Sequence, residues 1–294
     1  MAALPAVAFF GTSELGARVL DELVRRDRVQ VTAVVTQPDR RAGRGRRLRS
    51  PAVADAARRL GIPLHQPEQA SADPPPADAG AVVAFGQLVR PPLLGAYPLY
   101  NLHPSLLPRW RGAAPLERAL MAGDDHTGVA VIELVEALDA GPLHGLVPFP
   151  IGPDDDAGSL AERALELGMP LLEAALRGET GGRPQASEGA TYAAKLSAAD
   201  RVIDWRMPAP SLDRLVRALS PRVGASTALD GRPVVVWRAR IVAAGPPPGD
   251  VAGPLVVGCG TGALELLELQ PEGRRRMTTA EFLRGLRTPP VRAG

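Results

Sequence analysis

The sequence is poor in cysteine and in long apolar runs, and each shortage excludes a class of protein. Cys259 is the only cysteine, so no disulfide can form within the chain, a cysteine-rich zinc site is excluded, and a reducing compartment is expected. No run of about 18 or more apolar residues occurs, and the N-terminal segment lacks the basic flank and cleavage pattern of a signal peptide. We therefore expect a soluble, cytoplasmic protein that does not enter a membrane.

Lysine is also nearly absent, because Lys195 is the only one, and arginine carries the positive charge. The formal net charge of +2 over 294 residues is close to neutral, so the arginines matter chiefly where they cluster. The densest cluster contains no acidic residue and consists of Arg40, Arg41, Arg44, Arg46, Arg47 and Arg49. Such a run is either a solvated loop or a surface that contacts phosphate groups.

Short apolar runs alternate with helical patterns in the first half of the chain. Strands are predicted at 6–10, 30–36, 81–85 and 99–102. After the first strand, apolar residues recur at helical spacing with Ser13 as the expected N-cap, and a second helix is expected between Ser50–Pro51 and Gly61. This alternation predicts an α/β, Rossmann-like N-terminal domain with a mostly parallel sheet and ligands at the carboxyl ends of its strands.

The second half changes character after a linker. A capping box at Ser159–Glu162 predicts a helix towards Gly178, with a kink at Pro170, and the Gly, Ser and Pro content of 178–190 predicts a linker. Beyond it we expect a small β-rich domain, with a helix at 211–219 and strands at 233–242, 255–257 and 264–269. The predicted division is a catalytic domain at 1–180, a linker at 181–204 and a C-terminal domain at 205–294.

Two polar side chains mark the end of the strand at 99–102. Asn101 and His103 point to the same side of an extended strand, because side chains alternate with period two. An amide and an imidazole aimed at one point can hold a developing oxyanion, an effect worth about 3 kcal/mol per donor. Asp139, before the small-residue turn at 140–142, is the best candidate to orient the imidazole. On spacing alone, a simple turn aspartate is the favoured interpretation.

Several segments together resemble the folate-dependent formyltransferases. NLHPSLLPRWRGAAP from Asn101, followed by ALDAGPL from Ala137, resembles the catalytic signature of that family. FFGTSELGARVLDEL, VTQPDRRAGRGRRL, AFGQLV and TYAAKLSAADRVIDW agree in the same order. The segment SLLPRWRGAAP is similar in particular to the branch that formylates methionyl-tRNA. The resemblance covers nearly the whole chain and departs from the family pattern at Leu219–Thr227.

This resemblance implies a reaction and a set of residues. The formyl group of 10-formyltetrahydrofolate would pass, without a metal, to the amino group of initiator methionyl-tRNA for translation initiation. Asn101 and His103 would hold the oxygen of the intermediate, while Asp139 would orient His103 and favour its charged form. The folate would lie along a loop and a turn whose residues are Ser105, Leu106, Leu107, Pro108, Phe85, Gln87 and Leu88.

The resemblance also implies contacts with RNA. The six arginines between Arg40 and Arg49 would meet the acceptor end of the tRNA, and the C-terminal domain would be an OB-fold-like barrel that helps to hold it. Arg274, Arg275 and Arg276 are candidate contacts there, and a monomer is expected.

Three other functions remain open from the sequence. A formyltransferase acting on an amino sugar nucleotide or on glycinamide ribonucleotide would use the same triad but would not need the arginine cluster. Hydrolysis would release formate, with water in place of the amine. A non-catalytic RNA-binding protein on the same scaffold would have no use for Asn101, His103 and Asp139 in one cleft.

Overall fold

A computed structural model describes residues 3–42, 47–69 and 72–294 of the chain. The chain forms two compact units. Unit 1 comprises Met1–Gly112, Gly128–Phe149 and Ala161–Tyr192, and unit 2 comprises Ala113–Thr127, Pro150–Leu160 and Ala193–Gly294. Nowhere in the described ranges does a helix combine the length and the apolarity needed to cross a bilayer.

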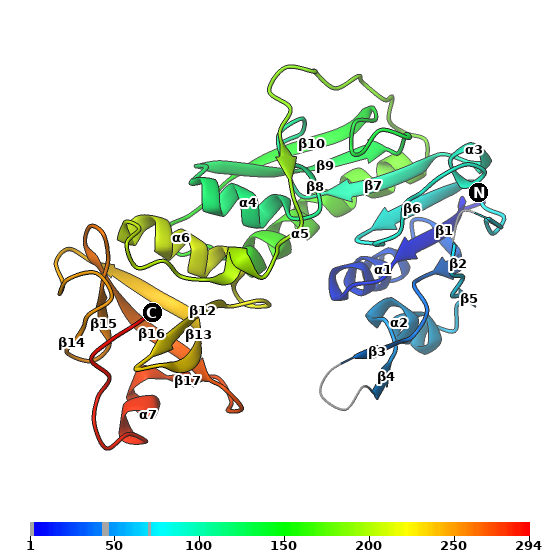
Figure 1. The fold of residues 1–294 in the computed structure, drawn as a ribbon. Coiled ribbons are helices and arrows are strands. Elements are labelled where there is room, and N and C mark those ends of the chain that lie inside the picture. The colour runs from blue at the N-terminus through cyan, green and yellow to red at the C-terminus, as the bar shows by residue number, and fades with distance from the viewer. Residues whose placement is uncertain (1–2, 43–46, 70–71) are drawn as a thin grey trace. The chain divides into compact units, whose positions relative to one another are not determined.

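The centre of unit 1 is a seven-stranded sheet with the order β10-β9-β7-β6-β1-β2-β5 (Figure 1). Its strands are β1 Ala6–Gly11, β2 Gln30–Val35, β5 Leu64–His65, β6 Ala79–Val83, β7 Leu99–His103, β9 His126–Glu133 and β10 Leu143–Pro150. The five strands from β7 to β5 are parallel, and β9 is antiparallel to β7. The predicted Rossmann-like, mostly parallel sheet is therefore confirmed. Its strand order reverses between β1 and β6, where such sheets leave a crevice at their carboxyl ends.

The first two helices follow their predicted patterns, with one error in capping. In α1 (Glu14–Arg26) the Ser13 hydroxyl accepts a hydrogen bond from the Gly16 amide at 3.3 Å, as expected. In α2 (Ala52–Leu60) the residue before the helix is Pro51, which makes no side-chain cap, so Ser50 is not the N-cap. The Ser50 hydroxyl instead accepts a hydrogen bond from the Arg58 guanidinium at 2.6 Å. Gly61 ends the helix in the left-handed region, with φ +69°.

Helix α5 (Ala157–Leu176) begins two residues earlier than predicted and continues through Pro170. The Asp156 carboxylate accepts from the Ser159 amide at 2.8 Å, and the Ser159 hydroxyl accepts from the Asp156 amide at 3.1 Å. The capping box is therefore Asp156 with Ser159, and the predicted box from Ser159 to Glu162 is wrong. Asp156 is the N-cap because its side-chain oxygen lies three residues before Ser159 and can accept from the Ser159 amide. Glu162 pairs with Arg18 of α1 instead.

The third strand also ends earlier than its apolar run. β6 stops at Val83, and Ala84 has φ +46°, so the chain turns before Phe85. The Phe85 ring packs edge to face on Phe10, with 5.7 Å between ring centroids, in a buried cluster that also contains Leu93 and Leu99.

Unit 2 is built on an antiparallel sheet with the order β12-β13-β16-β15-β14, and β17 pairs with β16 (Figure 1). Its elements are α4 Pro115–Ala122, α6 Ala209–Leu219, β12 Ala225–Leu229, β13 Arg232–Val242, β14 Val251–Ala252, β15 Val256–Gly258, β16 Ala263–Pro271, β17 Met277–Thr278 and α7 Thr279–Arg284. The C-terminal segment bridges from Ala293 to Leu229 on one edge and from Arg292 to Asp250 beside the other. The predicted β-rich C-terminal domain is confirmed, and its two edges are covered.

Candidate active site

The site begins on β7, which carries Asn101 and His103 on one face. β7 lies between β6 and β9, so its backbone is paired on both sides. His103 is only 4 % exposed, and Asn101 is partly exposed. A strand held on both edges gives these side chains fixed directions, as a catalytic pair requires.

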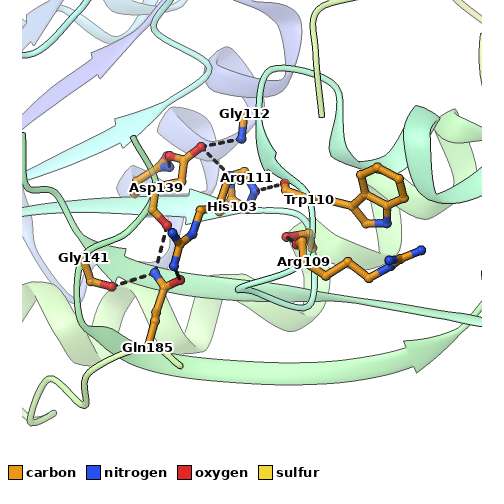
Figure 2. A network of polar contacts seen from close by, with 10 residues as sticks. His103, Arg109, Trp110, Arg111, Gly112, Asp139, Gly141 and Gln185 are labelled. Atoms are coloured by element: carbon orange, nitrogen blue, oxygen red, sulfur yellow. Dashed lines mark hydrogen bonds and ion pairs between the residues drawn. The ribbon is translucent and has the colours of Figure 1, made fainter. Parts of the chain in front are cut away.

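Asp139 meets both side chains from a turn far along the chain. It lies between β9 and β10 with φ +48°, a left-handed conformation unusual for a non-glycine residue. One carboxylate oxygen accepts from the Gly112 amide at 2.8 Å and lies 3.7 Å from His103 Nδ1 (Figure 2). The other lies 3.4 Å from the Asn101 amide nitrogen. Asp139 is thus a turn residue that also joins the predicted pair.

The hydrogen-bond partner of His103 Nε2 shows which ring nitrogen carries the hydrogen. His103 Nε2 lies 2.9 Å from the Trp110 carbonyl oxygen (Figure 2). A carbonyl only accepts, so Nε2 carries the hydrogen and donates it, and Nδ1 faces Asp139. Burial lowers the pKa of His103 below its ordinary 6.5, while Asp139 and the Trp110 carbonyl act in the opposite direction. Asp139 thus favours the charged imidazole, as expected, but desolvation outweighs it and the net shift favours the neutral form.

The loop after β7 is folded on itself and holds the Trp110 carbonyl in place. The Ser105 hydroxyl donates to the Arg109 carbonyl at 2.8 Å, and Trp110, with φ +65°, donates its amide to the Thr191 hydroxyl at 2.9 Å. The Arg109 guanidinium stacks 4.5 Å from the Trp110 ring centroid. The Trp110 ring therefore packs within the loop.

Gln185 contacts this site and was not predicted from the sequence. Its side-chain amide donates to the carbonyls of Asp139 and Gly141, at 2.9 Å and 2.7 Å, and its oxygen accepts from Arg111 at 2.8 Å (Figure 2). Gln185 lies in the segment predicted to be a linker. A lone polar residue among Gly, Pro and Ser carries no local signal for such a contact.

Comparison with known proteins decides the family. Residues 5–176 match the model described as "Formyl transferase", and residues 195–287 match "Formyl transferase, C-terminal domain". The chain belongs to the formyl transferase family. A protein of Paracoccus denitrificans named methionyl-tRNA formyltransferase is 41 % identical, covering 96 % of this chain and 98 % of that protein. One of Halorhodospira halophila with the same name is 43 % identical, covering 97 % of each.

Solved structures share this fold at lower identity. HypX from Aquifex aeolicus, in complex with tetrahydrofolic acid, aligns with a TM-score of 0.66 and 20 % identity over 96 % of this chain and 47 % of its own. An N-formyltransferase from Helicobacter canadensis, in complex with folinic acid and dTDP-3-aminofucose, aligns with a TM-score of 0.66 and 14 % identity over 94 % of this chain and 100 % of its own. Both show the formyl transferase fold.

The residues predicted to line the folate pocket differ in exposure. The side chains of Phe85, Ser105 and Leu107 are buried, and Leu88 is 70 % exposed. Phe85 also uses its carbonyl, which accepts from Thr12 at 2.6 Å and from Gln37 at 3.1 Å. The buried side chains of Phe85, Ser105 and Leu107 thus offer almost no surface to a ligand. Leu106, Pro108 and Gln87 are partly exposed, and the Gln87 side-chain amide donates to the Pro67 carbonyl at 3.3 Å.

Among the residues described, no group of three or more His, Cys, Asp or Glu side chains is arranged to hold a metal ion.

The described parts of the arginine cluster form two short paired strands, the arginine hairpin, in this formyl transferase. β3 (Arg40–Ala42) pairs antiparallel with β4 (Arg47–Arg49), which places Arg40 directly across from Arg49. The side chains of Arg40, Arg41, Arg47 and Arg49 are exposed, and Arg44 and Arg46 lie outside the described residues. Like charges directly opposite on a ladder destabilise it, so this hairpin favours a polyanionic partner.

The second basic group, in unit 2, is less available. Arg275 pairs with Glu281 at 2.7 Å, and Arg276 pairs with Glu268 at 2.6 Å. Arg276 also stacks 5.1 Å from the Trp237 ring centroid. Two of the three predicted contacts thus already have acidic partners.

Gly141 makes the Asp139 turn possible, and its replacement is expected to break it. A Cβ added at Gly141 would lie 1.8 Å from the Glu133 carbonyl oxygen, so Gly141→Ala must displace the turn. We expect a loss of about 1–3 kcal/mol in the free energy of unfolding, measured in urea, together with lower activity. Gly181→Ala is the matched control, because no atom lies within 4 Å of its added Cβ. Equal stability of the two variants would contradict this account of the turn.

Proposed function

We propose that this protein transfers the formyl group of 10-formyltetrahydrofolate to the amino group of initiator methionyl-tRNA. The observation that carries the proposal is identity of 41 % and 43 %, over both family domains, to proteins named methionyl-tRNA formyltransferase. The fold and the grouping of Asn101, His103 and Asp139 support a formyl transfer reaction. The proposal includes a monomer in the cytoplasm, with the domain division at 1–180, 181–204 and 205–294.

In this proposal Asn101 and His103 stabilise the intermediate. The amine nitrogen attacks the formyl carbon, and the carbonyl oxygen takes up the displaced electron pair. The Asn101 amide and the Nε2–H of His103, which donates to Trp110 in the free protein, are the donors on this face. Donors of this type each contribute about 10²- to 10³-fold to the rate.

His103 and Asp139 hold the proton that the attacking amine releases. The neutral imidazole has a lone pair on Nδ1, which lies 3.7 Å from the Asp139 carboxylate. A proton taken up there is stabilised by that carboxylate. It then passes to the folate nitrogen as the bond from that nitrogen to the formyl carbon breaks, which completes the transfer.

The arginine hairpin supports tRNA as the acceptor. A small amine has no phosphodiester chain to meet Arg40, Arg41, Arg47 and Arg49, whereas the acceptor end of a tRNA has one. We propose that these residues, with Arg44 and Arg46, contact the tRNA.

A competition between acceptors tests the proposal. The purified protein, with 10-formyltetrahydrofolate, would be given initiator methionyl-tRNA, an amino sugar nucleotide, glycinamide ribonucleotide or no acceptor. We expect kcat/KM for methionyl-tRNA to exceed that for each small amine by about 10³-fold or more, because only the tRNA can use the hairpin.

Each alternative has its own result in the same experiment. Faster transfer to a small amine would show that this amine, and not the tRNA, is the substrate. Formate release without acceptor at a comparable rate would indicate hydrolysis. Binding of tRNA with no transfer at all would indicate a non-catalytic RNA-binding protein.

A further inference from the structure

Gln185 is partly buried in a stretch of chain that is otherwise exposed. Apart from Gln185, all residues from Gly181 to Gly189 are exposed to solvent. The chain on either side is tied down by backbone hydrogen bonds, between Leu143 and Arg183 at 2.7 Å and 2.9 Å and from the Arg111 amide to Thr191 at 2.9 Å. Gln185 is therefore presented to the site from a fixed backbone.

The contacts of Gln185 use the full set of groups that a neutral amide offers. The side-chain nitrogen donates both hydrogens, to the carbonyls of Asp139 and Gly141, and the oxygen accepts from Arg111. Serine, lysine and arginine cannot supply two donors and an acceptor from one uncharged head group. A glutamate would keep the Arg111 contact but lose both donations.

These contacts close a ring through Asp139. Gln185 joins the Asp139 carbonyl to Arg111, and the next amide along, that of Gly112, donates to the Asp139 carboxylate at 2.8 Å. Backbone and side chain of Asp139 are thus both tied to β8 (Arg111–Gly112), as Figure 2 shows. The turn has a left-handed residue at Asp139, so it needs such external contacts to persist.

We propose that Gln185 is a positioning residue, which holds the Asp139 turn against β8 and so aims the Asp139 carboxylate at His103. This inference rests on the proposed function for its catalytic consequence, but the geometry of the His103–Asp139 pair does not depend on which amine is formylated. The Gln185 side chain contacts Arg111, Asp139 and Gly141, and it acts on His103 through Asp139.

Kinetics of two variants test the role in catalysis. Gln185→Glu retains a partner for Arg111 and loses both donations, while Gln185→Met has similar length and loses all three contacts. We expect kcat for formyl transfer to fall by about 10- to 100-fold in each, since small misplacements of catalytic groups have effects of this size. KM for the folate and for the tRNA should change by less than about threefold, because ground-state binding is untouched. Gln30→Met, on an exposed side chain at the start of β2, is the matched control.

A spectroscopic measurement separates positioning from general damage. With ¹⁵N-labelled histidine, the ring signals of His103 are identified by their loss in His103→Gln, and their titration is followed in the folded protein. Asp139→Asn should lower the titration midpoint of His103, because Asp139 raises its pKa. Gln185→Met should move it in the same direction, whereas Gln185→Glu adds a charge and is not used here.

The two measurements have distinct outcomes. A midpoint for Gln185→Met that equals the wild-type value, in a folded protein, overturns the inference even if activity falls. So does unchanged kcat in both variants of Gln185. If the wild-type protein formylates no methionyl-tRNA, the proposed function fails, and the His103 midpoint still decides whether Gln185 positions Asp139.

Discussion

His103→Ala is expected to lower kcat for formyl transfer by about 10³- to 10⁴-fold. The imidazole has two proposed tasks, donation to the oxyanion and uptake of the amine proton, and each alone is worth about 10²-fold or more. Single-turnover transfer to methionyl-tRNA at saturating folate measures the effect without product release. Folate binding should persist, because the predicted folate contacts are made by Phe85, Gln87, Leu88 and Ser105–Pro108, and His103 is proposed to act only at the formyl group.

Two further variants sharpen this prediction. His103→Gln offers an N–H donor to the Trp110 carbonyl but has no basic nitrogen, so it should recover part of the oxyanion stabilisation and none of the proton transfer. Asn101→Ala combined with His103→Ala should be little slower than His103→Ala alone, since groups acting on one intermediate are not additive. A His103→Ala enzyme within about tenfold of the wild type would remove His103 from the mechanism.

The neutral, buried state of His103 also has a consequence for stability at low pH. The folded-state pKa lies below the ordinary 6.5, so the unfolded chain takes up a proton that the folded protein resists. The contribution of His103 to the free energy of unfolding is complete above pH 6.5 and falls as the pH drops below that value. The free energy of unfolding should therefore decline less between pH 7 and pH 5 for His103→Gln than for the wild type.

Replacing four exposed arginines of the hairpin with glutamine is expected to weaken tRNA binding by about a thousandfold. Arg40, Arg41, Arg47 and Arg49 each contribute about one phosphate contact, and each contact adds a slope near 0.9 in log affinity against log salt. With Arg44 and Arg46 counted as well, six such contacts make wild-type affinity fall on the order of a thousandfold between 50 and 200 mM salt. Removal of four of them should lower the slope by roughly 3.6. Filter binding at a series of salt concentrations measures both. Stability should not fall, because the change removes repulsion between Arg40 and Arg49.

Two double variants separate the effect of where the arginines lie from the effect of the protein's total positive charge. Arg40→Gln with Arg49→Gln removes two charges from the hairpin, and Arg25→Gln with Arg177→Gln removes two from exposed residues that already pair with glutamates. Only the first pair should lower the salt slope. Equal slopes for the two pairs would show that overall charge, and not the hairpin, attracts the RNA.

Local patterns predicted the elements well where one residue had one possible role. Ser13 and Gly61 begin and end their helices as expected, since a cap depends on a few neighbouring backbone groups. The errors arose where two residues competed for one role. Asp156 and Ser159 are both good N-caps, and only the path of the chain before α5 shows that Asp156 takes the position.

By itself the sequence determined the alternation of strands and helices, the common face of Asn101 and His103, and the family, because these follow from periodicity and from contiguous motifs. Only the tertiary structure decided that Asp139 reaches that face, that Gln185 braces its turn, and that His103 is neutral. Contacts between segments dozens of residues apart leave no trace in local spacing. The charge of a buried imidazole depends on how much water the whole fold excludes, which no short motif specifies.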